Sequence, residues 1–415
     1  MNYANQLSKK LIEKNAVIGI VGIGYVGGAL AKGASDAGLD VLGFTRNQIR
    51  AEAINDQKLP NFTATTDIAL IATCDVICIC VPTPVHEDKS PDLVPLIGSL
   101  QNTAKHMKKG TLIIIESTVA PGTTRNIALP ILLLSGLKPE KDFFLSFSPE
   151  RVDPGNKTYT HRNTPKVVSG LSSESTILTQ EFYQNFVETV VCVSSPEVAE
   201  MSKILENTFR LVNISLSNEL LNYTNKLGID LWEVINAAAT KPFGFLPHYP
   251  GPGIGGHCIP VDPFYLLDDA TKRGVRLGII EEAGTINTAQ PGKVVNRTLD
   301  IIKQTNGVKK THTALLVGLS YKEDIEDRRE SPSLRIFELL QEQKVTVSYH
   351  DPYNPEYNGM SSVHLTQLNI QDLDIIVIVT PHSNIDYQAL ISYERPILDT
   401  KNALKRFSSP YIYRL

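Results

Sequence analysis

The chain has 415 residues, of which 42% are hydrophobic and 20% are charged. This is an ordinary globular composition, and the length favours two or three domains. The net charge of −4, from 40 basic and 44 acidic residues, indicates neither a nucleic-acid partner nor an anionic membrane surface. No apolar run approaches the roughly 20 residues of a membrane span, and the first residues lack a signal-peptide core, so we expect a cytoplasmic protein.

The five cysteines fit neither a disulfide framework nor a zinc site. Cys78 and Cys80 alternate within an apolar segment, where cysteine behaves as a small hydrophobic residue. His257 and Cys258 lie near an acid but lack a second ligand cluster, so we expect no metal. The other cysteines are Cys74 and Cys192.

Unbroken apolar segments alternate with helical ones near the start of the chain. The apolar segments are Ala16–Val21, Val41–Phe44, Cys74–Val81 and Thr111–Glu116. Continuous apolar strands are typical of a parallel sheet that is covered on both faces. Strands separated by helices therefore predict a doubly wound fold.

A long helix is predicted from Pro196 to about Lys226. Proline followed by glutamate is a good helix start, and Gly228 is a good stop. The helix should link two domains, and its apolar excess also suits a dimer contact. Its apolar residues recur at steps of three to four: Met201, Leu205, Phe209, Val212, Leu216 and Leu220.

The last third of the chain repeats the first in outline. Ala314–Tyr321 resembles Ile18–Tyr25, and Asp374–Pro381 resembles Asp75–Pro82. We therefore predict an α/β fold of two Rossmann-like doubly wound domains joined by a long central helix. In place of the second and third glycines the later copy has Ser320 and Glu323, so it should hold something other than a dinucleotide. The expected domains are residues 1–195, 196–300 and 301–415.

The glycines Gly22, Gly24 and Gly27 stand between a strand and a helix, which is the setting of a dinucleotide-binding turn. A structural glycine turn is the alternative. The second strand ends in Thr45 and Arg46, without the acid that grips the ribose of NAD, so NADP stays open beside NAD. Arg46 also fits a plain surface charge. The residues expected at the cofactor are Gly22, Gly24, Tyr25, Val26, Gly27, Thr45, Arg46, Pro82, Thr83 and Thr118.

The segment Gly251–Asp262 sets Cys258 in a glycine-rich loop, four residues before an acid. Glycines allow a substrate to approach the backbone closely, and a reactive thiol needs polar neighbours that handle protons. A nucleophilic thiol beside a nucleotide cofactor predicts an oxidation through a covalent thioester. An inert buried cysteine is the alternative.

Three polar residues share one stripe of the long helix, namely Lys203, Asn207 and Arg210. An ammonium and an amide on one face can stabilise a developing oxyanion, although a solvated face has the same pattern. A second polar motif, Ser148–Gly155, follows an apolar strand, and its carboxylates are suited to orienting water or sugar hydroxyls.

Together these segments resemble the UDP-sugar 6-dehydrogenase family, from Val17 to about Asn402. Within it, the loops around Ser148–Asn156 and Lys241–Pro252 look most like the UDP-N-acetylglucosamine branch of bacterial surface-polysaccharide synthesis. The UDP-N-acetylmannosamine branch is close, and UDP-glucose dehydrogenases usually carry a different loop before the cysteine. The most specific segments are Gly255–Asp262, Ser148–Arg151, Glu200–Arg210, Tyr321–Lys322 and Arg329–Pro332.

The resemblance implies a four-electron oxidation of the sugar C6 alcohol, with two NAD per turnover and Cys258 carrying first a thiohemiacetal and then a thioester. Lys203 and Asn207 would hold the oxygen charge, with Lys203 also in proton transfer. The residues that would position or activate water are Asp262, Glu150 and Thr118. The residues implied at the substrate are Glu150, Arg151, Lys203, Asn207, Arg210, Tyr249, Gly253, Gly255 and Lys322.

Arg329 would reach the cofactor by the same resemblance. The family pattern Asp-Thr-Arg-Glu-Ser reads Asp-Arg-Arg-Glu-Ser at 327–331, with Arg328 in place of threonine. The expected partners are a UDP-sugar and further copies of the chain, as a homodimer or larger assembly, and neither nucleic acid nor membrane. A two-electron hydroxyacid dehydrogenase and a non-catalytic nucleotide-sugar sensor are the alternative functions.

Overall fold

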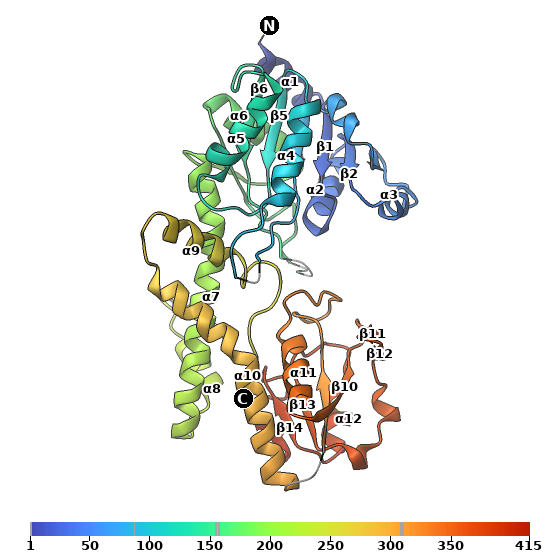
Figure 1. The fold of residues 1–415 in the computed structure, drawn as a ribbon, viewed down its shortest axis with the longest axis vertical. Coiled ribbons are helices and arrows are strands. Elements are labelled where there is room, and N and C mark those ends of the chain that lie inside the picture. The colour runs from blue at the N-terminus through green and yellow to red at the C-terminus, as the bar shows by residue number, and fades with distance from the viewer. Residues whose placement is uncertain (1, 87, 154–155, 157, 308–310) are drawn as a thin grey trace. The chain divides into compact units, whose positions relative to one another are not determined.

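The computed structural model describes residues 2–86, 88–153, 156, 158–307 and 311–415, and Figure 1 shows its elements. The chain divides into two compact units. Unit 1 comprises Met1–Glu206 and Phe264–Val275, and unit 2 comprises Asn207–Pro263 and Arg276–Leu415. Among the described residues, no helix combines the length and the apolar character that crossing a bilayer demands.

Unit 1 is built on an eight-stranded sheet whose first six strands are parallel. The order of those six is the order of a dinucleotide-binding sheet, and the chain reverses direction across it between β1 and β4. The last two strands, β7 and β8, run antiparallel to β6. In spatial order the strands are β3 (Phe62–Thr65), β2 (Asp40–Phe44), β1 (Val17–Val21), β4 (Val76–Ile79), β5 (Thr111–Ile115), β6 (Phe143–Phe147), β7 (Lys166–Gly170) and β8 (Val190–Cys192).

Helices cover both faces of this sheet, as the unbroken apolar strands predict. The helices of unit 1 are α1 (Tyr3–Ile12), α2 (Tyr25–Asp36), α3 (Gln48–Asn55), α4 (Val94–His106), α5 (Leu129–Leu132), α6 (Ser173–Gln184), the start of α7 (Pro196–Leu227) and most of α9 (Asp262–Lys272). Its shorter turns are η1 (Ile68–Thr73), the π-helical η2 (Thr124–Ala128) and η3 (Leu133–Ser135).

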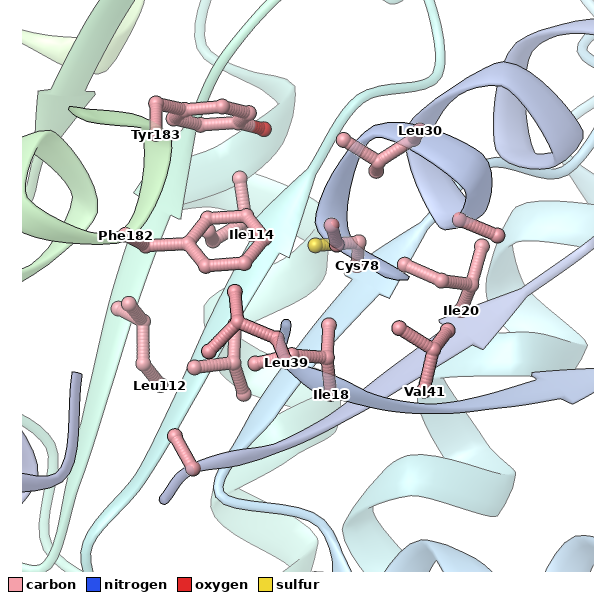
Figure 2. Packing of buried hydrophobic residues seen from close by; sticks show 14 of the residues in the cluster. Ile18, Ile20, Leu30, Leu39, Val41, Cys78, Leu112, Ile114, Phe182 and Tyr183 are labelled. Atoms are coloured by element: carbon pink, nitrogen blue, oxygen red, sulfur yellow. The ribbon is translucent and has the colours of Figure 1, made fainter. Parts of the chain in front are cut away.

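Strand β4 shows how alternate side chains feed two cores. Cys78 packs with Ile20 of β1, Leu30 of α2 and Phe182 of α6, as Figure 2 shows. Its neighbours Ile77 and Ile79 join the other core, which contains residues of α4. Because successive strand residues point to opposite faces, an unbroken apolar strand fills both cores. The prediction that Cys78 and Cys80 are small buried hydrophobic residues is confirmed.

Unit 2 contains a second, five-stranded sheet that is parallel throughout. Its strands in spatial order are β10 (Val345–His350), β9 (His312–Val317), β13 (Ile375–Ile378), β14 (Ile397–Asp399) and β15 (Ile412–Arg414), and a separate hairpin joins β11 (Glu356–Tyr357) and β12 (Met360–Ser361). Its helices and turns are the rest of α7, α8 (Leu231–Ala238), α10 (Gly278–Asn306), α11 (Pro332–Glu342), η4 (Leu365–Gln367), η5 (Ile370–Asp372) and α12 (Tyr387–Ser392).

The two copies of the predicted internal repeat share a matching hydrogen bond between an aspartate and a strand backbone. Asp75, before β4, accepts a bond from the backbone N–H of Val17, at the start of β1, at 3.1 Å. Asp374, before β13, accepts the matching bond from Thr313 in β9 at 3.0 Å. The predicted α/β class with two Rossmann-like sheets is confirmed, and so is the long helix, which ends just before Gly228.

Candidate active site

The three glycines after β1 differ in what surrounds them. Gly22 has a φ of +95°, and a Cβ there would lie 2.7 Å from the carbonyl oxygen of Cys80. A Cβ on Gly27 would lie 2.1 Å from the carbonyl oxygen of Gly22, so this glycine lets α2 pack against the turn. A Cβ on Gly24 would meet nothing within 4 Å, and among the described residues no side chain caps α2 there. The turn therefore fits a pyrophosphate at the open N-terminus of a helix.

The tip of β2 carries the residues expected near the ribose. The side-chain oxygen of Thr45 accepts a hydrogen bond from the backbone N–H of Asn47 at 3.3 Å. The side chain of Asn47 in turn caps α3, through the N–H of Arg50 at 3.1 Å. Arg46 is exposed. The oxygen of Asn47 thus serves the helix, which leaves Thr45 and Arg46 as the predicted cofactor residues at this tip.

Thr118 lies in a loop that is anchored to its neighbour. The hydroxyl of Thr83 donates to the carbonyl oxygen of Thr118 at 2.9 Å, and the hydroxyl of Ser117 donates to that of Val81 at 2.7 Å. These bonds join the loops that follow β4 and β5 at the carboxyl edge of the sheet. Ser117 and Val119 are buried, whereas Thr118 between them is partly exposed.

The far end of the same loop is held by α7. Both carboxylate oxygens of Glu200 accept backbone N–H groups, from Gly122 at 2.5 Å and from Thr124 at 2.8 Å. The side chain is fully buried. Burial raises the pKa of Glu200 to about 7, and the hydrogen bonds oppose that rise. Sequence reasoning included Glu200 in a motif but gave it no role.

The carboxylate of Glu150 has partners on both oxygens. One oxygen accepts the N–H groups of Arg151 and Val152, at 2.9 and 2.7 Å, and the other accepts the Lys166 ammonium at 2.8 Å. Burial alone would raise the pKa of Glu150, but Lys166, His161 and the hydrogen bonds lower it to about 2. Glu150 is therefore ionised at neutral pH. Residues 154 and 155 of its motif lie outside the described residues.

Lys166 is a buried cation between two acids, and its side chain is 4% exposed. Its ammonium lies 2.7 Å from Glu116 and 2.8 Å from Glu150, and the Tyr183 hydroxyl also donates to Glu116. Burial lowers the pKa of the Lys166 ammonium, but the two carboxylates outweigh this and raise it. Because β7 runs antiparallel to β6, its first residue lies at the edge where β5 and β6 end.

The loop that holds Cys258 is packed tightly in unit 2. Gly256 has a φ of +87°, and a Cβ there would lie 2.7 Å from the ring of Tyr321. A Cβ on Gly255 would lie 2.7 Å from the carbonyl oxygen of Glu330. Cys258 itself is exposed. The glycines thus let the loop pack against its neighbours, and Cys258 stays exposed on it.

Asp262 opens α9 and is bonded to the long helix. The Asn207 amide donates to the Asp262 carboxylate at 2.5 Å, and both side chains are buried. Lys203, one turn earlier on α7, is partly exposed, and Arg210 is exposed. The predicted stripe therefore lies on a helix, with Asn207 as its buried member.

Three side chains that are predicted to contact the substrate or the cofactor bond to partners within their own units. Arg151 pairs with Glu206 of α7 at 2.7 Å in unit 1. In unit 2, Arg329 pairs with Asp327 at 2.6 Å. The hydroxyl of Tyr249 donates to Asn236 at 2.8 Å.

The residues that remain from the prediction also lie in unit 2. Gly253 has a φ of +124°, which favours glycine, and Lys322 is partly buried directly after Tyr321. Arg328, which departs from the family pattern, donates to the carbonyl oxygen of Glu356 at 2.8 Å. That arginine therefore bonds to the β11–β12 hairpin.

The turn after β9 is closed by a carboxylate, unlike the turn after β1. Asp351 follows β10 directly, at the position that Thr45 takes after β2. It accepts the N–H groups of Leu319 and Ser320, at 2.6 and 3.1 Å, and lies 3.2 Å from buried His382. The N–H groups that would face a pyrophosphate are thus already bonded, which agrees with the prediction that this domain does not hold the dinucleotide.

Three family models match the chain. The NAD-binding domain of the UDP-glucose/GDP-mannose dehydrogenase family matches residues 16–187, its central domain matches 197–289, and its UDP-binding domain matches 315–406. The chain belongs to this family. It is an NAD-dependent UDP-sugar dehydrogenase, with the open glycine turn in the NAD-binding domain and the closed turn in the UDP-binding domain.

Named relatives resemble this dehydrogenase over almost its whole length. UDP-N-acetyl-D-glucosamine 6-dehydrogenase of Pseudomonas aeruginosa is 33% identical, over 89% of this chain and 91% of the relative. UDP-N-acetyl-D-mannosamine dehydrogenase of Pyrococcus horikoshii is 30% identical, over 96% of this chain and 98% of the relative. A solved structure of UDP-D-ManNAc dehydrogenase from Pyrococcus horikoshii has a TM-score of 0.88 at 29% identity, covering 96% of this chain and 98% of that one.

Proposed function

We propose that this dehydrogenase oxidises the C6 hydroxyl of a UDP-N-acetylhexosamine, UDP-N-acetylglucosamine first among them, to the uronate. The observation that carries the proposal is an exposed thiol, Cys258, on a tightly packed glycine loop that leads into the buried Asn207–Asp262 pair. The name of the Pseudomonas relative supports the glucosamine sugar. UDP-N-acetylmannosamine is the second candidate, supported by the name of the Pyrococcus relative.

The reaction removes four electrons from the sugar and consumes one water. NAD, when bound, accepts two electrons as a hydride, so each uronate requires two NAD. The Cys258 thiolate adds to the C6 aldehyde, which keeps the intermediate bound for the second oxidation. The resulting thioester is cleaved by water, which returns the thiol and leaves the carboxylate.

Lys203 and Asn207 are proposed to hold the charge that develops on the C6 oxygen. An amide has two N–H donors, so Asn207 can bond Asp262 with one and retain the other for substrate. Lys203, one turn away, supplies the positive charge and moves a proton.

Asp262, Glu150 and Thr118 are proposed to position the hydrolytic water. Glu150 accepts three protein hydrogen bonds and its pKa is about 2, which supports orienting water over taking its proton. At the substrate we propose Arg151, Arg210, Tyr249, Gly253, Gly255 and Lys322, and at the cofactor Arg329.

We propose that the enzyme works in the cytoplasm as a homodimer, in surface-polysaccharide synthesis. Large apolar side chains stand exposed along α7, at Phe209, Leu216 and Leu220 in unit 2. An exposed apolar stripe on a helix is suited to a second copy. A monomeric mass by sedimentation at micromolar concentration would contradict the dimer.

Lys203→Ala is expected to lower kcat at least about a hundredfold, because one oxyanion donor contributes on the order of 3 kcal/mol to the barrier. Steady-state rates at saturating sugar and NAD measure this. Lys226→Ala, at an exposed lysine near the end of the same helix, is the control and should retain the parent rate. Turnover near the parent level in Lys203→Ala would rule out the assigned role.

A panel of UDP-sugars, each with NAD and with NADP, tests the substrate. We expect UDP-N-acetylglucosamine with NAD to give the fastest rise of reduced-nicotinamide absorbance, with two reduced cofactors per uronate. One reduced cofactor per sugar would favour a two-electron dehydrogenase, and binding without reduction would favour a sensor. Reduction of NADP but not of NAD would overturn the assignment of NAD as the cofactor.

A further inference from the structure

Glu200 is a buried acid that accepts two backbone N–H groups of one loop. Its side chain has no exposed surface, and its oxygens lie 2.5 Å from the nitrogen of Gly122 and 2.8 Å from that of Thr124. Two charged side chains, Glu197 and Arg125, interact electrostatically with Glu200, and they pair with each other at 2.7 Å. A buried carboxylate is costly unless each oxygen is bonded, and these two donors meet that need.

The loop is also fixed at its other end. Thr83 donates to the carbonyl oxygen of Thr118 at 2.9 Å, and Ser117 donates to that of Val81. Thr118 is therefore held directly through its own backbone, four residues before the first N–H that Glu200 accepts. A Cβ on Gly122 would lie 2.9 Å from the Asn126 amide nitrogen, and its φ of +91° also favours glycine.

The acid and Lys203 lie on one side of the same helix. Residues three apart in an α-helix are surface neighbours, and both residues belong to unit 1. The carboxylate thus ties the loop of Thr118 to the helical turn that precedes Lys203. Two groups given roles in the reaction are joined through one buried side chain.

We propose that Glu200 is a positioning residue, which sets the place of Thr118 relative to Lys203 by accepting both N–H groups. The inference rests on the proposed roles of Thr118 and Lys203. Two acceptor oxygens are needed, because a glutamine would offer one acceptor and turn an N–H₂ group toward the second donor. The loop would then be released at one of its two bonds.

Glu200→Gln is expected to lower kcat at least about tenfold while the KM values for NAD and UDP-sugar stay within about threefold, as expected when positioning rather than binding is lost. Glu200→Asp keeps the charge but is one methylene shorter, so it should show the same split and serves if the amide variant folds poorly. Glu197→Gln, at a partly exposed neighbour on this helix, is the matched control and should keep the parent kcat.

A double-mutant cycle separates positioning from general damage. If Glu200 acts through Thr118, Glu200→Gln should change kcat by less than about twofold in a Thr118→Val background. Independent effects that multiply in the double variant would overturn the proposal. An unchanged kcat in both Glu200 variants would overturn it equally.

Amide hydrogen exchange of the peptide spanning 117–126 tests the clamp without turnover. Faster exchange at Gly122 and Thr124 in Glu200→Gln than in the parent supports it, and equal exchange overturns it. If the parent oxidises no UDP-sugar, the proposed function fails, whereas this exchange result still decides whether the carboxylate holds the loop.

Discussion

Replacing Cys258 by serine is expected to lower uronate formation at least about a thousandfold, since loss of a catalytic nucleophile removes most of the rate. A thiol is already a few per cent thiolate at pH 7 and is intrinsically nucleophilic, whereas a hydroxyl needs a strong base to react. Cys258 is exposed, so substitution should leave the fold intact. Product uronate, quantified by mass alongside reduced cofactor, is the measurement.

Cys192→Ser is the matched control, because Cys192 is the other exposed cysteine among the described residues. It should form uronate at the parent rate. A trapped reaction, digested midway, should carry the added sugar mass on the peptide that contains Cys258. If uronate accumulates at the parent rate and that adduct is not found, the thioester mechanism is wrong.

Local patterns were enough to predict the glycine turn, the long helix and the repeat. The spacing of Gly22, Gly24 and Gly27 carries its own geometry, and the period of α7 is visible in its apolar residues. The likeness of the two segments aligns Asp374 with Asp75, and these carboxylates accept N–H groups of β9 and β1 respectively. The spacing and the period depend on neighbours in sequence, and the repeat is a likeness between two segments, so the sequence alone predicts all three.

Lys166 could not be predicted, because its environment is made by strands far apart in the chain. Glu116 follows β5 and Glu150 follows β6, and only the antiparallel turn of β7 brings Lys166 to both. The one signal in the sequence is a lysine that leads into an apolar strand, where a charge is rare unless paired. The role of Asp351 could not be predicted for the same reason, because the N–H groups that it accepts follow a different strand, β9.

The two Rossmann-like sheets differ in the residue that follows their second strand, and this difference bears on which of them has an open turn. After β2 the chain has Thr45, and the turn after β1 stays open at Gly24. After β10 the chain has Asp351, whose carboxylate bonds the N–H groups of the turn after β9. An internal carboxylate and a bound phosphate compete for the same donors, so of these two turns the one after β1 is the one left open to an anion.

Lys166→Met is expected to destabilise unit 1 by about 3–5 kcal/mol, the cost of removing one partner from a buried ion pair. Methionine preserves the volume but leaves Glu116, with no exposed side-chain surface, and Glu150 without their cation. Urea unfolding at pH 7 measures the loss. Lys32→Met, at an exposed lysine paired with Asp36 at 2.8 Å, is the control and should change stability by less than about 0.5 kcal/mol.

The pH dependence of that loss identifies its cause. In the parent, the pKa of Glu150 is lowered from 4.5 to about 2, so its contribution is present above pH 4.5 and is lost as the pH falls toward 2. Without Lys166, burial should raise the pKa values of Glu116 and Glu150. As the pH falls from 7 to 5, protonation of these carboxylates should then remove the cost of their unpaired buried charge. The variant should therefore approach the parent at pH 5, and Lys166→Met/Glu116→Gln should recover part of the loss at pH 7. A deficit equal at both pH values would show that lost packing, rather than unpaired charge, destabilises the variant.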